Sequence, residues 1–389
     1  MSNAFTKNEL RGLIEAFNDI PEYRKNLLNV EHILRDIIVI AVCGVIAGAD
    51  GPTAIFQWAE IHQEQLTRIL KLKFGIPSKD TIRRTLQAIQ PEAFQKCFLE
   101  WVDRFRAANE CKKEHIAIDG KTLRRSHDAK NNLGPLHIVS AFSTEHGISL
   151  GQLRTAAKSN EITAIPELLD SLALEGSVIS IDAQGTQVKI ADKIIAKKAG
   201  YVLAVKESRP KLLNAIKALF ADVSPCSKRV SAFVETETSH GRTEHREYRQ
   251  ATVPPEFFQK KRWAGLKTVG MVTRTRTDAK GKTETETRHF ISTERRNGAD
   301  FARYVRRHWG IENSLHWVLD MTFREDESRV RDRNVADNLS WIRRFTITLL
   351  KRHPGKQSLV GKRRMAGWSF DFLMELILGI QQTPENTEK

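Results

Sequence analysis

The order of expected strands and helices from residue 115 to the helix after Pro210 limits the fold more than any other feature of this chain. Strand patterns come first and then alternate with helical patterns, so the order is βββαβαβα. This order predicts an α/β protein with a mixed sheet and helices on both faces. The expected strands cover residues 115–119, 136–143, 147–153, 178–182 and 201–205, and the expected helices cover 161–174, 188–198 and a stretch after Pro210.

The same order is the arrangement of the ribonuclease H-like fold, and the flanking segments predict further parts of the molecule. Apolar residues at helical spacing predict a helical N-terminal domain, residues 1–108. A threonine-rich stretch with alternating residues predicts a β-rich insertion at about residues 229–292, within an α/β domain that spans 109–350. Lysine and arginine are frequent after residue 350, so we expect a basic C-terminal tail, residues 351–389.

The charge of the chain favours a polyanionic partner without deciding the function. Lysine and arginine outnumber aspartate and glutamate by 62 to 47, which attracts nucleic acid, although membrane-surface proteins and ordinary enzymes share this balance. The four cysteines are far apart, which argues against a zinc finger or a disulfide framework and fits a reducing cytoplasm. The apolar residues 37–49 are too few to cross a bilayer, so we expect a buried helix there and no membrane association.

Two aspartates, Asp119 and Asp182, occupy comparable positions at the ends of expected strands. In open α/β sheets, ligands bind beyond the carboxyl ends of the strands, although either aspartate alone could simply cap the following turn. Glu312, on a helix expected to begin near residue 300, is a third carboxylate. Hard divalent cations prefer such oxygen ligands, and a two-metal site for an in-line displacement needs several of them. The three carboxylates therefore predict a metal-dependent active site.

The helix that carries Glu312 allows a second interpretation. His308, Glu312 and His316 are four residues apart on one helical face, which is also a pattern for zinc, although no further ligand cluster supports it. We expect the neighbouring Trp309 and Trp317 to be core residues that dock this helix.

Four short motifs carry a resemblance to a known family. They are AIDGK at residues 117–121, SIDAQ at 180–184, HGRTE at 240–244 and HWGIEN at 308–313, the last followed by LHW at 315–317. With these motifs the chain resembles the DDE transposases of bacterial insertion sequences, in the branch of H-repeat-associated proteins. Residues 75–81 resemble the domain associated with that family, so the resemblance covers nearly the whole chain.

The resemblance implies that three carboxylates are both the catalytic residues and the ligands of two Mg²⁺ ions, which Mn²⁺ could replace: Asp119, Asp182 and Glu312. The wider superfamily also places a tyrosine, an arginine and a lysine around the glutamate. Tyr304 and Arg307 precede Glu312 here, but Leu319 stands near the lysine position. The signature is therefore only partly met, and we assign no role to Leu319.

Six basic residues are candidates for contact with DNA phosphates: Arg83, Arg84, Lys121, Lys206, Arg242 and Arg307. Arg83 and Arg84 open an expected helix that Ser78 caps. For these residues, a solvated or paired side chain is an equal alternative; Arg242, for example, could pair with Glu244.

As a whole, the resemblance implies a DNA transposase that cleaves the ends of its element and transfers the freed strands into target DNA. Its partners would be double-stranded DNA, both element ends and target, and a second copy of the chain, because two ends require two active sites. It would act in the bacterial cytoplasm, on the nucleoid. Two alternatives remain at this point: an inactive, transposase-derived DNA-binding protein, and a standalone metal-dependent nuclease.

Overall fold

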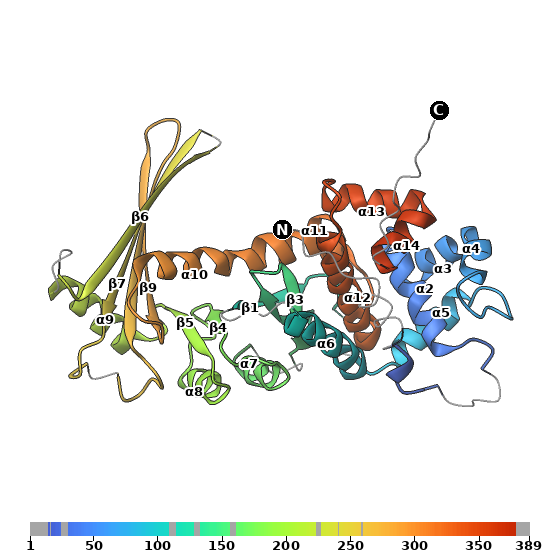
Figure 1. Cartoon of the computed structure of the whole chain (residues 1–389), viewed down its shortest axis with the longest axis horizontal. Helices are drawn as coiled ribbons and strands as arrows, with labels where there is room; N and C mark the ends of the chain where they lie inside the picture. The colour runs from blue at the N-terminus through green and yellow to red at the C-terminus, as the bar shows by residue number, and fades with distance from the viewer. Residues whose placement is uncertain are drawn as a thin grey trace.

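The computed structural model describes residues 15, 17–24, 30–108, 114–127, 133–155, 161–222, 227–239, 241–257 and 260–378. One nine-stranded sheet runs through the molecule. In Figure 1, long strands stand upright at one end, helices cover the sheet in the middle, and helices from both ends of the chain gather at the other end.

The first five strands form the mixed arrangement that the sequence predicts. They are β1 (His115–Leu123), β2 (Leu136–Ser143), β3 (Ile148–Arg154), β4 (Val178–Ile181) and β5 (Gly200–Val205). The first three pair antiparallel, whereas β1, β4 and β5 run parallel to one another. The expected fold class, a mixed sheet with flanking helices, is therefore confirmed.

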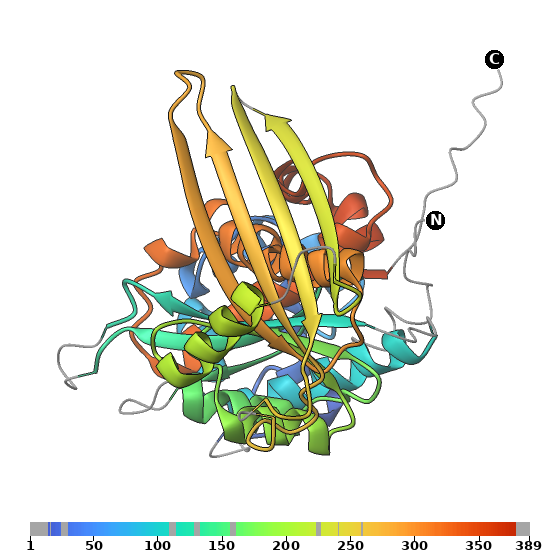
Figure 2. The same cartoon turned by 90° about the vertical axis from the view of Figure 1, so that its left-hand side faces the viewer.

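The expected β-rich insertion lies at residues 230–292 and is a continuation of the same sheet. It comprises β6 (Val230–Ser239), β7 (Arg242–Thr252), β8 (Thr268–Thr277) and β9 (Thr283–Ser292). The end of β9 pairs antiparallel with β5, which gives the strand order β3-β2-β1-β4-β5-β9-β8-β7-β6. Figure 2 shows the far ends of these four strands rising beyond the rest of the molecule.

Helices cover both faces of the sheet because alternate residues of its strands are apolar on both sides. Val178 and Val202 pack with Phe301 of α10 (Gly298–Ile311) on one face. Ile179 and Leu203, one residue further along each strand, belong to the core on the opposite face. The helices there are α7 (Glu161–Asp170), α8 (Val188–Ala196) and α9 (Pro210–Asp222).

The helical end of the molecule combines the beginning and the end of the chain (Figure 1). It contains α2 (Leu34–Ile46), α3 (Pro52–Ile61), α4 (Gln63–Thr67), α5 (Lys79–Ala88), α6 (Pro91–Ala108) and α12 (Arg333–Arg352). The apolar stretch near residue 40 is the buried helix α2, as expected. α12 packs against α2, α5 and α6 and also against β3, so this helix joins the N-terminal helices to the sheet.

Much of the expected basic C-terminal tail forms helices, which reach residue 378. α13 (Leu359–Trp368) contacts α2 and α12, and α14 (Phe370–Leu378) contacts α12 and α13. The reason is that Leu373, Leu376 and Ile377 are buried, while the ammonium group of Lys362 donates hydrogen bonds to two backbone carbonyls. Residues 379–389 lie outside the described chain. Among the described helices, none is both long and apolar enough to cross a bilayer.

Candidate active site

Two of the expected site residues meet where β1 and β4 run side by side. Ile118 pairs with Ile181, so Asp119 and Asp182 are the next residue on each of two neighbouring parallel strands. β4 ends there, but β1 continues to Leu123 because its other neighbour, β2, still pairs with it. Asp119 therefore lies within a strand, whereas the sequence analysis placed it at the end of one.

The surroundings of the two aspartates differ. Asp182 begins a turn, and its Oδ1 accepts hydrogen bonds from the backbone amides of Gln184, at 3.0 Å, and Gly185, at 3.1 Å. Asp182 is thus a turn cap as well as a site residue. After Asp119, Gly120 leaves room for a hydrogen-bonded pair, His137 and Glu161, with which a Cβ atom at this position would collide. This close approach accounts for the glycine of the AIDGK motif.

Glu312 lies near Asp119 and Asp182, but it comes from the helical segment that packs on the sheet. α10 crosses β1 and ends at Ile311, and a π-helical segment, η4 (Glu312–His316), follows before α11 (Trp317–Met321). Asp119, Glu312 and His316 each offer an atom within 4.8 Å of the other two. Single turns of π-helix are rare in proteins, and those that do occur are often found at functional sites. The sequence predicted the helix but not this change of register.

Crowding of the carboxylates changes their protonation. Burial, followed by the neighbouring Glu312 and then Asp182, raises the pKa of Asp119 to about 8. His316, the largest influence on Glu312, helps to lower the pKa of that carboxyl group. At neutral pH, therefore, Asp119 keeps its proton in the metal-free protein and Glu312 carries the negative charge.

The three carboxylates line one cleft of about 530 Å³ between α10, the ends of β4 and β5, and the middle of β9. Its basic lining residues are Lys206, Lys217 and Arg288. Arg288 also places its guanidinium 5.1 Å from the ring centre of Trp309. The sequence analysis singled out Lys206 but missed Lys217 and Arg288, because a lysine on α9 and an arginine on β9 have no motif that points to this cleft.

The zinc interpretation of the Glu312 helix does not describe this geometry. His308 shares a 2.8 Å hydrogen bond with the Ser180 hydroxyl, which also bonds His115 at 2.9 Å. Burial lowers the pKa of His308 to about 4. The helix therefore brings Glu312 and His316 together with Asp119, and the His308 ring nitrogen Nδ1 is engaged by the sheet.

The two tryptophans beside Glu312 are exposed, which corrects the expectation that they belong to the core. Trp309 is 45% exposed and Trp317 is 59% exposed. Leu315 and Leu319, which are fully buried, dock this part of the chain instead. Leu319 is not one of the residues that line the cleft. Of the two tryptophans, Trp309 lines the cleft.

The other basic candidates lie in varied surroundings. Lys121 is buried, and its ammonium group pairs with Asp320 at 2.6 Å and Asp326 at 2.8 Å, so it is not available to a phosphate in this structure. Arg307 is ion-paired with Glu145 at the surface.

Three more candidates lie away from the cleft. Arg242 is exposed at the first residue of β7, next to the turn residue Gly241; His240, which precedes it, lies outside the described residues. Arg83 and Arg84 are exposed on α5, which begins at the predicted cap.

Comparison with known proteins agrees with this architecture. Residues 110–350 match the model of the family described as "Transposase DDE domain", and residues 14–102 match that of the family described as "DDE_Tnp_1-associated". The chain is 37% identical to the Escherichia coli "H repeat-associated putative transposase YhhI" over 376 residues, which are 95% of this chain and 99% of that protein. It is 38% identical to "Putative transposase YncI" of another Escherichia coli strain, over 98% of both chains.

A cryo-EM structure of the piggyBac transposase in a synaptic complex with hairpin DNA is 12% identical, with a TM-score of 0.42, over 100% of this chain and 84% of that chain. A likeness of this size carries no argument here. The family models and the full-length relatives do: the chain belongs to the DDE transposase family, in the branch of the H repeat-associated transposases.

Proposed function

We propose that this protein is a DNA transposase that cleaves the ends of its element and joins the freed 3′ ends to target DNA by phosphoryl transfer. The observation that carries the proposal is the convergence of three carboxylates on one cleft. Asp119, Asp182 and Glu312 come from β1, the end of β4 and the helix above the sheet, although 193 residues separate the first from the last (312 − 119).

The donor set fits divalent cations. Carboxylates so close that one retains a proton at neutral pH are held in a repulsive arrangement that a cation would relieve. Asp119, Asp182 and Glu312 would hold two ions, Mg²⁺ or in its place Mn²⁺. Such ions, when bound, supply activation of an attacking oxygen and stabilisation of a departing one.

The chain itself would position the DNA. Lys206, Lys217 and Arg288 line the cleft and are suited to the charged phosphate, and the formal net charge of +15 favours approach of a polyanion. The two backbone amides that hold the Asp182 carboxylate fix its orientation before DNA arrives. Because an element has two ends, we also propose that two copies of the chain act together on DNA.

The test is Mg²⁺-dependent cleavage of a supercoiled plasmid that carries both element ends. We expect Asp182→Asn and Glu312→Gln to lose at least about a thousandfold in cleavage rate, because removal of a metal ligand removes stabilisation of the transition state. Glu167→Gln is the matched control, since Glu167 is an exposed carboxylate on α7. Equal cleavage by all four proteins would contradict the proposal.

The same assay separates the two alternatives. Binding of the ends without cleavage by the wild-type chain would indicate an inactive DNA-binding descendant of a transposase. Cleavage without joining, tested with ends that have been cut beforehand, would indicate a nuclease.

A further inference from the structure

His316 occupies an unusual position for a buried histidine. Its side chain is 6% exposed, and its Nδ1 lies 3.6 Å from Asp119 Oδ2 and 3.6 Å from Glu312 Oε2. Both distances exceed those of good hydrogen bonds. Its other ring nitrogen, Nε2, is buried and has no hydrogen-bond partner among the residues that the structure describes. The imidazole thus points at two carboxylates without bonding either of them closely.

Two other histidines with little exposed surface make ordinary hydrogen bonds. His115 bonds Thr144 at 2.9 Å and Ser180 at 2.9 Å, and His353 bonds Glu375 at 3.0 Å. A buried polar group that lacks close partners is costly unless something else binds it. The Nδ1 atom of His316 faces both carboxylates without a close hydrogen bond to either, so it is placed to bind a ligand that the two carboxylates share.

A single cation meets that requirement. Ligand atoms at ~2.0–2.3 Å from one ion can be up to ~4.5 Å apart, so separations of 3.6 Å allow the imidazole and the carboxylates to bind the same ion. The local fold fixes these side chains. Leu315 is fully buried, and the ammonium group of Lys351 donates a 2.7 Å hydrogen bond to the carbonyl of Ser314, within the π-helical segment.

We propose that His316 is a direct ligand, together with Asp119 and Glu312, of one of the two catalytic ions. The proposal rests on the function proposed above and adds a nitrogen donor to its metal site. Imidazole binds Mn²⁺ and later first-row ions more readily than it binds Mg²⁺, which prefers oxygen. The site with His316 is thus selective for Mn²⁺ over Mg²⁺, and the π-helical segment places the extra ligand.

The experiment uses the full chain with Mn²⁺ alone, without DNA. Pulsed electron paramagnetic resonance detects a nitrogen nucleus bonded to Mn²⁺, and titration followed by the signal of free Mn²⁺ measures affinity. We expect a directly coordinated nitrogen in the wild-type protein and its loss in His316→Gln. Affinity for Mn²⁺ should fall at least about tenfold in that variant, with a smaller change for Mg²⁺ measured by competition.

His353→Gln is the matched control, because it removes a histidine that pairs with a carboxylate far from the cleft, and it should keep the nitrogen signal. Thermal unfolding of each variant shows whether it is folded, and the wild-type spectrum is decisive even if His316→Gln is not. Bound Mn²⁺ without a nitrogen ligand, or a nitrogen signal that persists in His316→Gln, would overturn the role of His316 and leave the carboxylate site intact. Failure of the wild-type chain to bind either ion would overturn both this inference and the proposed metal-dependent function.

Discussion

Asp119 is a carboxyl group that the fold places beside Glu312 and Asp182, and burial together with these neighbours raises its pKa to about 8. In the unfolded chain an aspartate has a pKa near 4. Between these values the folded protein binds more protons than the unfolded one, so stability falls as the pH rises and the contribution is lost above about pH 8. The residue that we propose for metal binding therefore destabilises the metal-free protein at the pH at which it is ionised.

Replacement of this group tests the argument. At pH 8.5, with a chelator present, the free energy of unfolding of Asp119→Asn should be about 1–3 kcal/mol higher than that of the wild type. This difference should become smaller as the pH is lowered towards 5. Urea unfolding followed by circular dichroism measures it. With Mn²⁺ present the order should reverse, because only the wild type gains the free energy of binding. Asp371→Asn, at an exposed position on α14, should change nothing. A gain that does not depend on pH would contradict the assignment of the shifted pKa.

Among the elements, α5 carries the basic residues furthest from the cleft that we expect to meet DNA. The Ser78 hydroxyl accepts a 3.1 Å hydrogen bond from the Thr81 amide and so begins the helix, while Ile82 is buried. The next two residues, Arg83 and Arg84, are thereby turned outward. Both guanidinium groups are therefore accessible to DNA phosphates from solvent.

The two arginines nevertheless differ in their partners. Arg83 lies 3.4 Å from Asp80 and also donates a hydrogen bond to Gln87, at 3.2 Å. No ion pair with Arg84 is found within the described part of the chain. Arg84→Ala should weaken binding to duplex DNA about three- to tenfold and reduce the slope of log affinity against log salt by about 1. Arg83→Ala should have a smaller effect.

Fluorescence anisotropy at several salt concentrations measures both quantities. Arg68→Ala, at the residue that follows α4, is the control, because Arg68 is an exposed arginine with its own partner, Glu64. If Arg84→Ala left both affinity and slope unchanged, α5 would have no part in binding.

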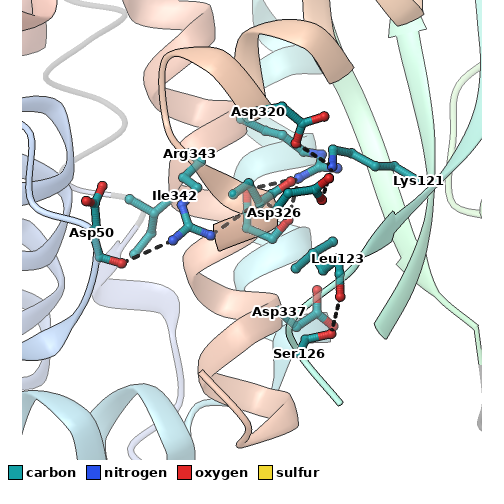
Figure 3. A network of polar contacts seen from close by, with 12 residues as sticks. Asp50, Lys121, Leu123, Ser126, Asp320, Asp326, Asp337, Ile342 and Arg343 are labelled. Carbon is teal, nitrogen blue, oxygen red and sulfur yellow. Dashed lines mark hydrogen bonds and ion pairs between the residues drawn. The ribbon is translucent and has the colours of Figure 1, made fainter. Parts of the chain in front are cut away.

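On the scale of the whole molecule, buried charges connect the sheet to the helices at the end of the chain. Glu325 is fully buried and lies 3.4 Å from Arg344 and 3.5 Å from Arg343, both on α12, and it accepts a 3.0 Å hydrogen bond from Ser340. Arg343 in turn donates a 3.1 Å hydrogen bond to the carbonyl of Asp50, before α3. Figure 3 shows Arg343 between Asp50 and the acidic loop that precedes α12.

The same network extends to the strand that carries Asp119. Lys121, two residues further along β1, pairs with Asp320 and Asp326 (Figure 3). Because Asp320 belongs to α11 and Asp326 to the short helix at Glu325–Glu327, these pairs tie β1 to the segment that follows Glu312 and His316. The position of one carboxylate of the site is thus linked to that of another.

Loss of the central buried charge should be severe. Glu325→Gln should lower the free energy of unfolding by about 3–5 kcal/mol, because it leaves Arg344 buried without its opposite charge. Glu327→Gln, two residues along the chain, removes an exposed partner of Arg324 and should have no measurable effect. Chemical unfolding of both variants provides the measurement. Equal stability of the two proteins would show that the buried pairs are replaceable.

Local sequence alone was enough to predict the elements around the site. The apolar strand before Asp182, the cap at Ser78 and the helix before Glu312 depend on neighbours within a few residues, and all three are found. The strand order of the core also follows, because strands that alternate with helices pair parallel. The nearness of the two aspartates was therefore predictable from the chain.

The rest depended on contacts between distant parts of the sequence. Trp309 and Trp317 are exposed because of the way the helix packs on the sheet. His316 lies in the π-helical segment, whose change of register no local pattern revealed. Lys121 is buried and ion-paired because Asp320 and Asp326, about two hundred residues later in the chain, pack against it. The sequence by itself determined which residues carry the charges and where the strands and helices form. Only the tertiary structure decided which charges meet, because that depends on how buried surfaces pack.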